Sequence, residues 1–403
     1  MNVLSQNMRP LDGLVVLDFS QFLAGPLCSL KLADLGARVI KVERKGVGDL
    51  CRNLYLSDTD LDGDTTLFHA INRNKESIEV DMRDSADQKM LRQLLKNADV
   101  MIQNFRPGVI EQMGFGYKDV QALNPTIIYG SVSGYGESGP WVKFPGQDLL
   151  AQARSGMMWL NGRDGGAPQA TGLALADMLA GHSLTQGILA GLVQRGIKGR
   201  GCLVQTSLLE AMLDFQFEVL STHLNDGRRT PKRAKHHGAH AYLGSPYGIY
   251  ETLDGYIALA MTPSISKLAQ LLGIKNLDHV DEIKGAALKN RDEINATFAA
   301  RLKNNTTQYW LDILQPEDIW CAEVMDWNML LSHPAYHELD FEQKIQGKDG
   351  FELIGLRSPI RIDGQTLKSN RAAPKLGADQ STVLNDLLLV ASEPTAVQNS
   401  LKK

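Results

Sequence analysis

Short apolar runs alternate with helical segments over the first 135 residues, and this alternation limits the possible folds more than any other feature of the sequence. The apolar runs are rich in Val, Ile and Leu, as buried strands are, and the segments between them carry apolar residues at helical spacing. The expected strands are 14–19, 39–43, 78–82, 100–105 and 127–132, and the expected helices are 24–35, 86–96 and 117–123. Strands joined by helices form right-handed crossovers and a parallel sheet with helices on both faces. The sequence therefore predicts an open α/β domain.

After residue 172 the pattern of the chain changes, and the part from 225 onward predicts a smaller α+β domain. Helices are expected at 173–195 and 207–224, with a strand at 201–204 between them. Residues 225–241 are basic and polar, which is typical of a linker or of an active-site loop. A hairpin is expected next, because Asp254-Gly255 lies between two apolar runs. Residues 264–327 then have mainly helical spacing.

These changes predict two domains and a returning tail. Residues 1–224 are expected to form the N-terminal part of the large domain, and 225–333 the linker and the small domain. The C-terminal segment, 334–403, has too little apolar material for a core of its own, so we expect it to pack back on the large domain. A length of 403 residues agrees with this division, because it is long for a single core.

Charge and the distribution of apolar residues argue against several classes of protein. The 42 Lys and Arg residues nearly balance 46 Asp and Glu residues, and no long basic run favours nucleic acid as a partner. No stretch of 18 apolar residues and no signal-peptide pattern occur, so we expect neither a membrane-spanning nor a secreted protein. The four cysteines (Cys28, Cys51, Cys202 and Cys321) form no CxxC pair. We therefore expect free thiols in the cytoplasm and no metal site.

The first turn after the first strand argues against a nicotinamide cofactor. Residues 20–26 contain no G-x-G-x-x-G, and without those glycines the backbone cannot approach a pyrophosphate in the usual way. Arg44 follows the second strand, and its guanidinium fork matches the oxygens of a phosphorylated ribose. The plainer interpretation is that Arg44 and Lys45 are solvated loop charges.

More cations recur where the expected strands end, at the edge of the sheet where open α/β folds bind ligands. These residues are Arg52, Arg73, Lys75, Arg106 and Lys143. Asn104, Phe105 and Arg106 together place an amide, an aromatic face and a guanidinium after a buried strand, which suits an adenine or a phosphate. Loops commonly carry Lys and Arg, so solvated charges are the alternative.

Asp177 is the strongest single candidate for chemistry. It is a lone acid in the apolar, small-residue run 171–181, near the start of an expected helix. The positive end of a helix favours the carboxylate form of an acid, and small neighbours leave room for a substrate. The alternative is an ordinary aspartate at the cap or first turn of the helix.

In their order and spacing, a series of short motifs resembles family III CoA-transferases of the CaiB/BaiF type, a group that includes formyl-CoA:oxalate and carnitine CoA-transferases. The motifs are Pro10–Gly13, Leu17–Ser20, Ala24–Pro26, Gly36–Arg44, Asn72–Lys75, Asn104–Gly108, Met113–Gly114, Gly134–Gly136, Pro145–Gly146, Gly199–Gly201 and Ala373–Gly377. The resemblance runs almost from end to end. It implies a Rossmann-like large domain, an interlocked homodimer, and coenzyme A bound as an acyl-CoA substrate.

The resemblance also assigns residues. The family's nucleophilic aspartate falls on Asp177. The family's contacts to CoA fall on Gln21, Phe22, Ala24, Arg44, Lys75, Asn104, Phe105 and Lys143. Arg106, which belongs to the motif Asn104–Gly108, is a further expected contact. Two departures stand out. Gln112 replaces a basic residue that some relatives place before Met-Gly, and the family's glycine-rich loop has no clear counterpart in 237–240.

The implied reaction needs a carboxylate and no metal. Asp177 attacks an acyl-CoA to give a mixed anhydride and then an aspartyl-CoA thioester, and a free carboxylic acid reverses both steps. Gln21 or backbone N–H groups near the first turn are expected to stabilise the oxyanions. The sequence does not define the acids used. The loop residues Arg228, Arg229, Arg233, His236, His237 and His240 are either a second carboxylate site or a solvated linker.

Two other functions are alternatives to transfer. The 2-methylacyl-CoA racemases of the same fold use two bases, and one of them is a histidine at the position directly before the one that matches Asp148. This chain has Gln147 at that position, and a neutral amide cannot take up a proton. A non-catalytic acyl-CoA-binding protein needs no carboxylate beside a thioester, so Asp177 argues against it.

Overall fold

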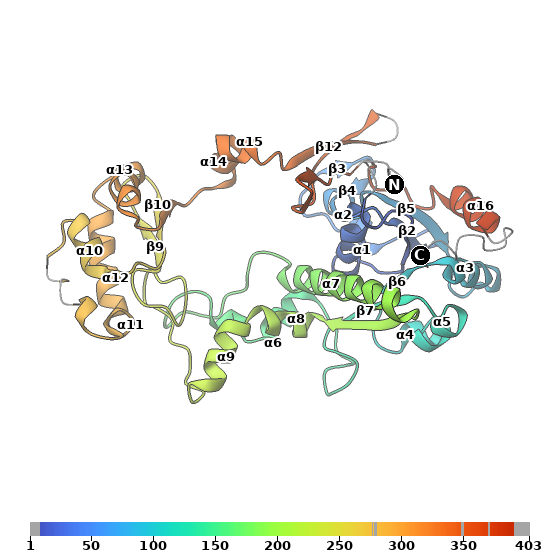
Figure 1. Ribbon diagram of the computed structural model, residues 1–403, viewed down its shortest axis with the longest axis horizontal. Helices are drawn as coiled ribbons and strands as arrows, with labels where there is room; N and C mark the ends of the chain where they lie inside the picture. The colour runs from blue at the N-terminus through green and yellow to red at the C-terminus, as the bar shows by residue number, and fades with distance from the viewer. Residues whose placement is uncertain (1–8, 276, 278–279, 348–349, 370, 391–403) are drawn as a thin grey trace. The chain divides into compact units, whose positions relative to one another are not determined.

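The computed structural model describes residues 9–275, 277, 280–347, 350–369 and 371–390 (Figure 1). They form two compact units. The first holds the described parts of Met1–Ala151, Ala174–Met212 and Asp340–Lys403, and the second those of Gln152–Leu173 and Leu213–Leu339. The expected small domain, 225–333, lies inside the second unit, which also takes in 152–173, 213–224 and 334–339. The segment that returns to the first unit therefore begins at Asp340 and not at the expected 334. The loop 152–173 belongs there because it pairs with the linker: Asp164 N donates to Ala234 O over 2.8 Å.

A six-stranded parallel sheet forms the centre of the first unit, as the sequence predicts. Its strands are β1 (Val15–Asp18), β2 (Arg38–Arg44), β5 (Lys75–Val80), β6 (Val100–Gln103), β7 (Ile128–Ser133) and β8 (Cys202–Ser207). Their order is β5-β2-β1-β6-β7-β8, and every neighbouring pair is parallel. The chain builds outward from β1 on one side and then from β6 on the other. The strand order therefore reverses between β1 and β6, and at such a point the loops diverge and leave a crevice for ligands.

Further helices and short strands, some in the first unit and some in the second, also have defined bounds. The helices are α1 (Ala24–Asp34), α2 (Thr66–Asn72), α3 (Ser85–Asn97), α4 (Val109–Gln112), α5 (Tyr117–Leu123), α6 (Asp148–Arg154), α7 (Leu175–Lys198), α8 (Leu208–Phe215), α9 (Phe217–Asn225), α14 (Trp327–Ser332), α15 (Pro334–Glu338) and α16 (Gln380–Val390). Among the described residues, three two-stranded ladders are β3 (Asp60–Leu61) with β4 (Asp64–Thr65), β12 (Glu342–Gln346) with β13 (Glu352–Leu356), and β14 (Arg361–Ile362) with β15 (Gln365–Thr366).

The core of the first unit lies between the sheet and its helices. Leu17, Ile40, Ile78 and Met101 are fully buried in adjacent strands, and Leu91 of α3 and Val120 of α5 pack in the same cluster. Strands buried on both faces carry nearly continuous apolar runs, which is why this part of the fold is readable in the sequence. The expected third strand, 78–82, is observed at 75–80, because its first residues are polar side chains that the fold buries.

Helices α1 and α7 pack closely and run in the same direction. A Cβ at Gly181 would lie 2.7 Å from Ala24 O, so only glycine permits this approach. One turn further along both helices, the Thr185 side chain lies beside the Cys28 thiol. Because Gly181 meets Ala24 and Thr185 meets Cys28, the helices are parallel. Asp177, one turn before Gly181, is therefore level with the turn that precedes α1.

The second unit has its own sheet and core. The sheet order is β11 (Cys321–Glu323), β10 (Tyr256–Leu259) and β9 (Gly248–Glu251), all antiparallel, and the predicted hairpin is confirmed. The helices α10 (Ile265–Leu271), α11 (Ala286–Lys289), α12 (Arg291–Leu302) and α13 (Thr307–Leu314) belong to the same unit. Tyr250, Ile257, Phe298 and Trp310 are buried in one cluster.

The helix expected at 207–224 is two helices. They are α8 and α9, which are separated at Gln216. Gln216 leaves the helical conformation with φ −92° and ψ 11°, and its side-chain amide donates to Ser155 O over 3.3 Å. A contact with a loop 61 residues earlier fixes this break, so helical periodicity alone does not detect it. Among the described residues, none of the helices is both long and apolar enough to cross a bilayer.

Substitution of glycine at two positions of α7 tests the close packing of the helices. Gly181→Ala should destabilise the protein, because the new methyl group meets the backbone of α1. Gly196→Ala is the matched control, because nothing lies within 4 Å of its Cβ position, and it should stabilise by about 0.5–1 kcal/mol. Denaturant unfolding measures both. Equal stabilisation by the two variants would contradict the packing described above.

Candidate active site

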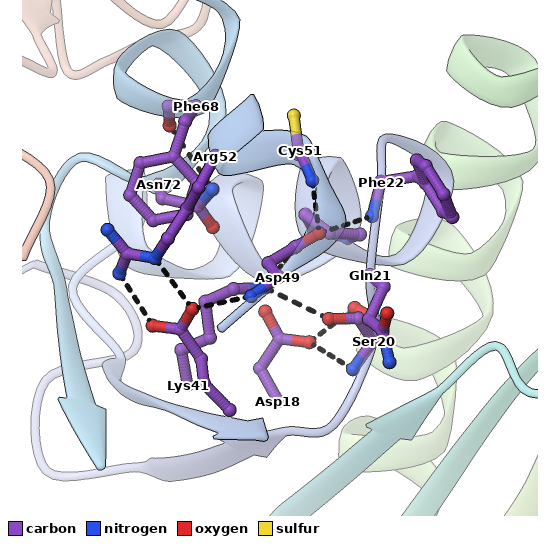
Figure 2. Close-up of polar contacts among 12 residues, drawn as sticks. Asp18, Ser20, Gln21, Phe22, Lys41, Asp49, Cys51, Arg52, Phe68 and Asn72 are labelled. Carbon is purple, nitrogen blue, oxygen red and sulfur yellow. Dashed lines mark hydrogen bonds and ion pairs between the residues drawn. The ribbon is translucent and has the colours of Figure 1, made fainter. Parts of the chain in front are cut away.

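The turn between β1 and α1 lies at the point where the strand order reverses, and a buried network of charges supports it (Figure 2). Asp18 ends β1 and is fully buried, and it accepts hydrogen bonds from the backbone and hydroxyl of Ser20. Lys75 lies 3.2 Å from Asp18 Oδ2. Burial opposes the charged form of Asp18, but Lys75 and Lys41 outweigh it and lower its pKa to about 2.

A second buried ion pair joins this turn to the loop after β2. Lys41 Nζ lies 2.8 Å from Asp49 Oδ2 and donates to Ser20 O over 2.9 Å. Asp49 Oδ1 accepts from the backbone N–H groups of Phe22 (3.1 Å) and Cys51 (2.9 Å). Phe22 has φ +62°, a left-handed conformation that is uncommon for a side chain of this size. Asp49 therefore helps to hold the turn in a strained shape.

Asn104 fixes the other side of the same turn. Its Oδ1 accepts from Gln21 N over 2.9 Å, and its Nδ2 donates to Gln21 O over 2.7 Å. The structure thus brings together three residues that the sequence singles out, Gln21, Phe22 and Asn104. Ala24 is buried at the start of α1. The amide of Asn104 is occupied with the backbone, so its observed role is to position the turn.

A cavity of about 430 Å³ opens beside this turn, at the carboxyl ends of β1, β2, β5 and β6. Its walls include Phe19, Gln21, Val42, Arg44, Lys45, Val47, Asp81, Met82, Arg83, Phe105 and Met113. Arg44, Lys45 and Arg83 give it three cations, and Phe105 gives it an aromatic face. Such a cavity suits a ligand that carries phosphates and a flat ring. The sequence analysis does not predict Arg83 as a ligand contact. Its position directly after the expected third strand, like that of Arg44 after the second, is the feature that indicates it.

Asp177 lies in the first turn of α7, half-buried, and its surroundings differ from the prediction. The sequence predicts that the helix N-terminus keeps its carboxyl ionised. In the structure, burial and the neighbouring Asp148 raise the pKa of Asp177 to about 7. The helix N-terminus is thus outweighed, because the positive end of α7 is directed at Asp148: Oδ1 of Asp148 accepts from Ala176 N (2.6 Å) and Asp177 N (3.2 Å).

Several predicted cations serve the fold. Lys75 is fully buried, and its ammonium binds Pro26 O (2.9 Å) and Asn72 Oδ1 (2.8 Å) as well as Asp18. Its three donors are used, which argues against the predicted contact with a ligand and favours a structural role. Arg52 pairs with Glu43 and Asp64, and Arg73 pairs with Asp34, so these guanidinium groups are also occupied.

Other candidates remain at the surface or lie in the second unit. Arg106 and Lys143 are exposed and do not line the cavity, and Gln147 is exposed directly before Asp148. In the second unit, Arg228 and Arg229 are exposed, but Arg233 is buried and donates to Asn161 O and Gly166 O over 2.7 Å each. Arg233 therefore stabilises the loop that contains Asn161 and Gly166.

Within the described part of the chain, no group of three or more His, Cys, Asp or Glu residues is arranged to hold a metal ion.

Comparison with known proteins gives consistent matches over nearly the whole chain. The profile described as CoA-transferase family III matches residues 11–380. Succinyl-CoA:glutarate CoA-transferase of Homo sapiens is 29% identical over 391 residues, which cover 95% of this chain and 87% of that protein. Probable fatty acyl-CoA transferase Rv3272 of Mycobacterium tuberculosis is 33% identical over 370 residues, which cover 89% of this chain and 93% of that protein. A solved structure of a CAIB/BAIF family protein from Brucella suis has a TM-score of 0.80 and 30% identity, and the match covers 94% of this chain and 100% of that one.

Proposed function

The chain belongs to CoA-transferase family III and is a CoA-transferase, and we propose that Asp177 carries the CoA between the donor and the acceptor acid. The observation that supports this role is the position of Asp177. It is half-buried at the start of α7, level with the β1–α1 turn and on the same unit as the cationic cavity. A carboxyl group with these surroundings can meet the thioester end of a ligand whose phosphates occupy the cavity.

The proposed reaction uses the same carboxyl group twice. An Asp177 oxygen attacks the thioester carbonyl, the C–S bond breaks, and a mixed anhydride and CoA thiolate form. The thiolate attacks the aspartyl carbonyl, which releases the donor acid and leaves CoA as a thioester on Asp177. The acceptor carboxylate attacks this thioester to give a new anhydride and thiolate. Attack of the thiolate on the acceptor's carbonyl then forms the product and restores Asp177.

We propose that the cavity binds the nucleotide part of CoA. Arg44, Lys45 and Arg83 would contact its phosphates, and Phe105 would pack on the adenine. The β1–α1 turn would direct the pantetheine toward Asp177, with Phe22 and Ala24 as contacts and Gln21 or backbone N–H groups as oxyanion donors. Asn104 would act by holding this turn. Arg106 and Lys143 remain further proposed contacts. These steps call for no metal.

The substrates proposed are an acyl-CoA and a small carboxylic acid. The human relative's name specifies succinyl-CoA and glutarate, and the mycobacterial relative's name specifies fatty acyl-CoA, so the family members compared differ in the acid they use.

Gln147 favours transfer over racemisation, because a neutral amide supplies no second base. The four cysteines are free thiols, which supports a place in the cytosol. Recovery of the protein in a secreted fraction would contradict that location.

Mass spectrometry tests the proposed nucleophile. Incubation with succinyl-CoA or acetyl-CoA, without acceptor, should leave CoA on the peptide that contains Asp177, and borohydride should reduce that thioester and inactivate the enzyme. Asp177→Ala should bind CoA nearly as the wild type does but lose nearly all transfer. Asp119→Ala, which removes an exposed first-turn acid of α5, is the control and should keep full activity. Substantial transfer by Asp177→Ala would refute the assignment.

The same preparation distinguishes transfer from isomerisation. The wild type should not exchange the α-proton of a 2-methylacyl-CoA with D₂O, because Gln147 cannot accept it. Exchange at a catalytic rate would favour the racemase alternative. CoA binding without either reaction would favour a binding protein.

Substitution of Arg44 tests the ligand of the cavity. Arg44→Ala should raise KM for acyl-CoA by about 10- to 150-fold, because a charge-assisted hydrogen bond contributes about 1.5–3 kcal/mol, and should leave KM for the free acid nearly unchanged. Lys96→Ala removes an exposed charge of α3 and serves as the control. Steady-state kinetics with acyl-CoA and its dephospho analogue measure the effect. If the wild type had equal KM values for the two, Arg44 would not bind the ribose phosphate.

We further propose that the enzyme works as an interlocked homodimer. Helices α9 and α14 have no buried residue within this chain, although both carry large apolar side chains. Phe217 is 69% exposed and Trp327 is 82% exposed, and apolar groups of this size are usually covered by a partner. Light scattering should find a dimer at all active concentrations. A stable and active monomer would contradict the proposal.

A further inference from the structure

Asp148 caps a helix to which it does not belong. It is the first residue of α6, and its Oδ1 accepts from the N–H groups of Ala176 and Asp177, at 2.6 and 3.2 Å. The cap position of α7 is Ala174, which has no side-chain hydrogen bond to offer. A local Ser, Thr or Asn at this position would satisfy the same N–H groups without a charge. The chain instead places a carboxylate beside the carboxyl group of Asp177.

A second acid so near Asp177 has an energetic consequence. The helix N-terminus attracts the charge of Asp148, but that charge repels a negative charge on Asp177. Burial and the charge of Asp148 raise the pKa of Asp177. From the packed helix α1, Lys31 acts instead on His182, which lies further along α7. Repulsion ends when Asp177 becomes an anhydride or a thioester, because both are neutral.

We propose that Asp148 is a positioning residue for the nucleophile: it holds the backbone of Asp177 through the first turn of α7, and its charge favours the covalent, neutral forms of Asp177. This inference rests on the proposed role of Asp177 as nucleophile. It predicts two separable effects. One is geometric and depends on the hydrogen bonds that Asp148 accepts. The other is electrostatic and depends on its charge.

Asp148→Asn separates the two effects, because the amide oxygen still accepts both N–H groups but carries no charge. The pKa of Asp177, raised to about 7 by burial and Asp148, should fall, because one of the two causes is removed. The rate of Asp177 acylation at saturating acetyl-CoA, measured by rapid quench and mass spectrometry, should rise with pH through about 7 in the wild type. In Asp148→Asn this rise should move to lower pH, and the fraction of enzyme held as aspartyl-CoA at pH 8 should decrease.

Further variants keep the test decisive. Asp148→Ser offers another uncharged acceptor if Asp148→Asn does not fold, and it should shift the profile in the same direction. Asp148→Glu keeps the charge and should retain a rise near the wild-type pH. A uniform loss of rate at every pH, with the rise unmoved, would show a purely structural role and overturn the inference. Failure of the proposed function is distinguishable, because the wild type would then form no adduct on Asp177 at all.

Discussion

The first unit depends on two buried ion pairs beneath the β1–α1 turn, Asp18 with Lys75 and Lys41 with Asp49. Buried charges are tolerated only when they are paired and hydrogen-bonded, and loss of one partner typically costs about 3–5 kcal/mol. Each pair joins segments from different parts of the chain, and each also binds backbone atoms near the turn. The network thus determines where β1 ends and which conformation Phe22 must adopt. The crevice at the reversal of strand order takes its shape from this turn.

The second constraint is the parallel packing of α1 and α7, which brings Asp177 level with that turn. Gly181 allows the two backbones to approach, and the contact of Thr185 with Cys28 sets the register of the helices. Residues more than 150 positions apart in the sequence therefore meet through packing between helices. The turn is rigid because it is hydrogen-bonded on both sides, and Asp177 is placed because α7 cannot slide along α1. The shape of the turn and the position of Asp177 along α7 therefore follow from the packing of the first unit.

The sequence predicts the sheet well, because strands buried on both faces leave a local apolar signal. It does not predict which charges are structural. Lys75 and Arg44 both look like cations at strand ends, yet Lys75 is fully buried and bound to three oxygens while Arg44 is exposed on a cavity wall. Burial of a lysine depends on Asp18, 57 residues away, and no local pattern records it. The break of the helix at Gln216 and the cap from Asp148 are likewise made by distant partners. Arg83 also follows a strand in the sequence, but the residues beside it do not distinguish it from an ordinary solvated loop charge.

Asp18 and Asp177 show how one residue type serves two purposes in this fold. Asp18 has two lysines as neighbours, and its pKa falls to about 2, so its charge is permanent at neutral pH and can stabilise the turn. Asp177 has burial and another acid as neighbours, and its pKa rises to about 7. A carboxyl group that gains by losing its charge is suited to forming a neutral covalent bond, whereas one paired with cations is not. The opposite surroundings of these two acids therefore support the proposal that Asp177, and not the more deeply buried Asp18, is the reactive group.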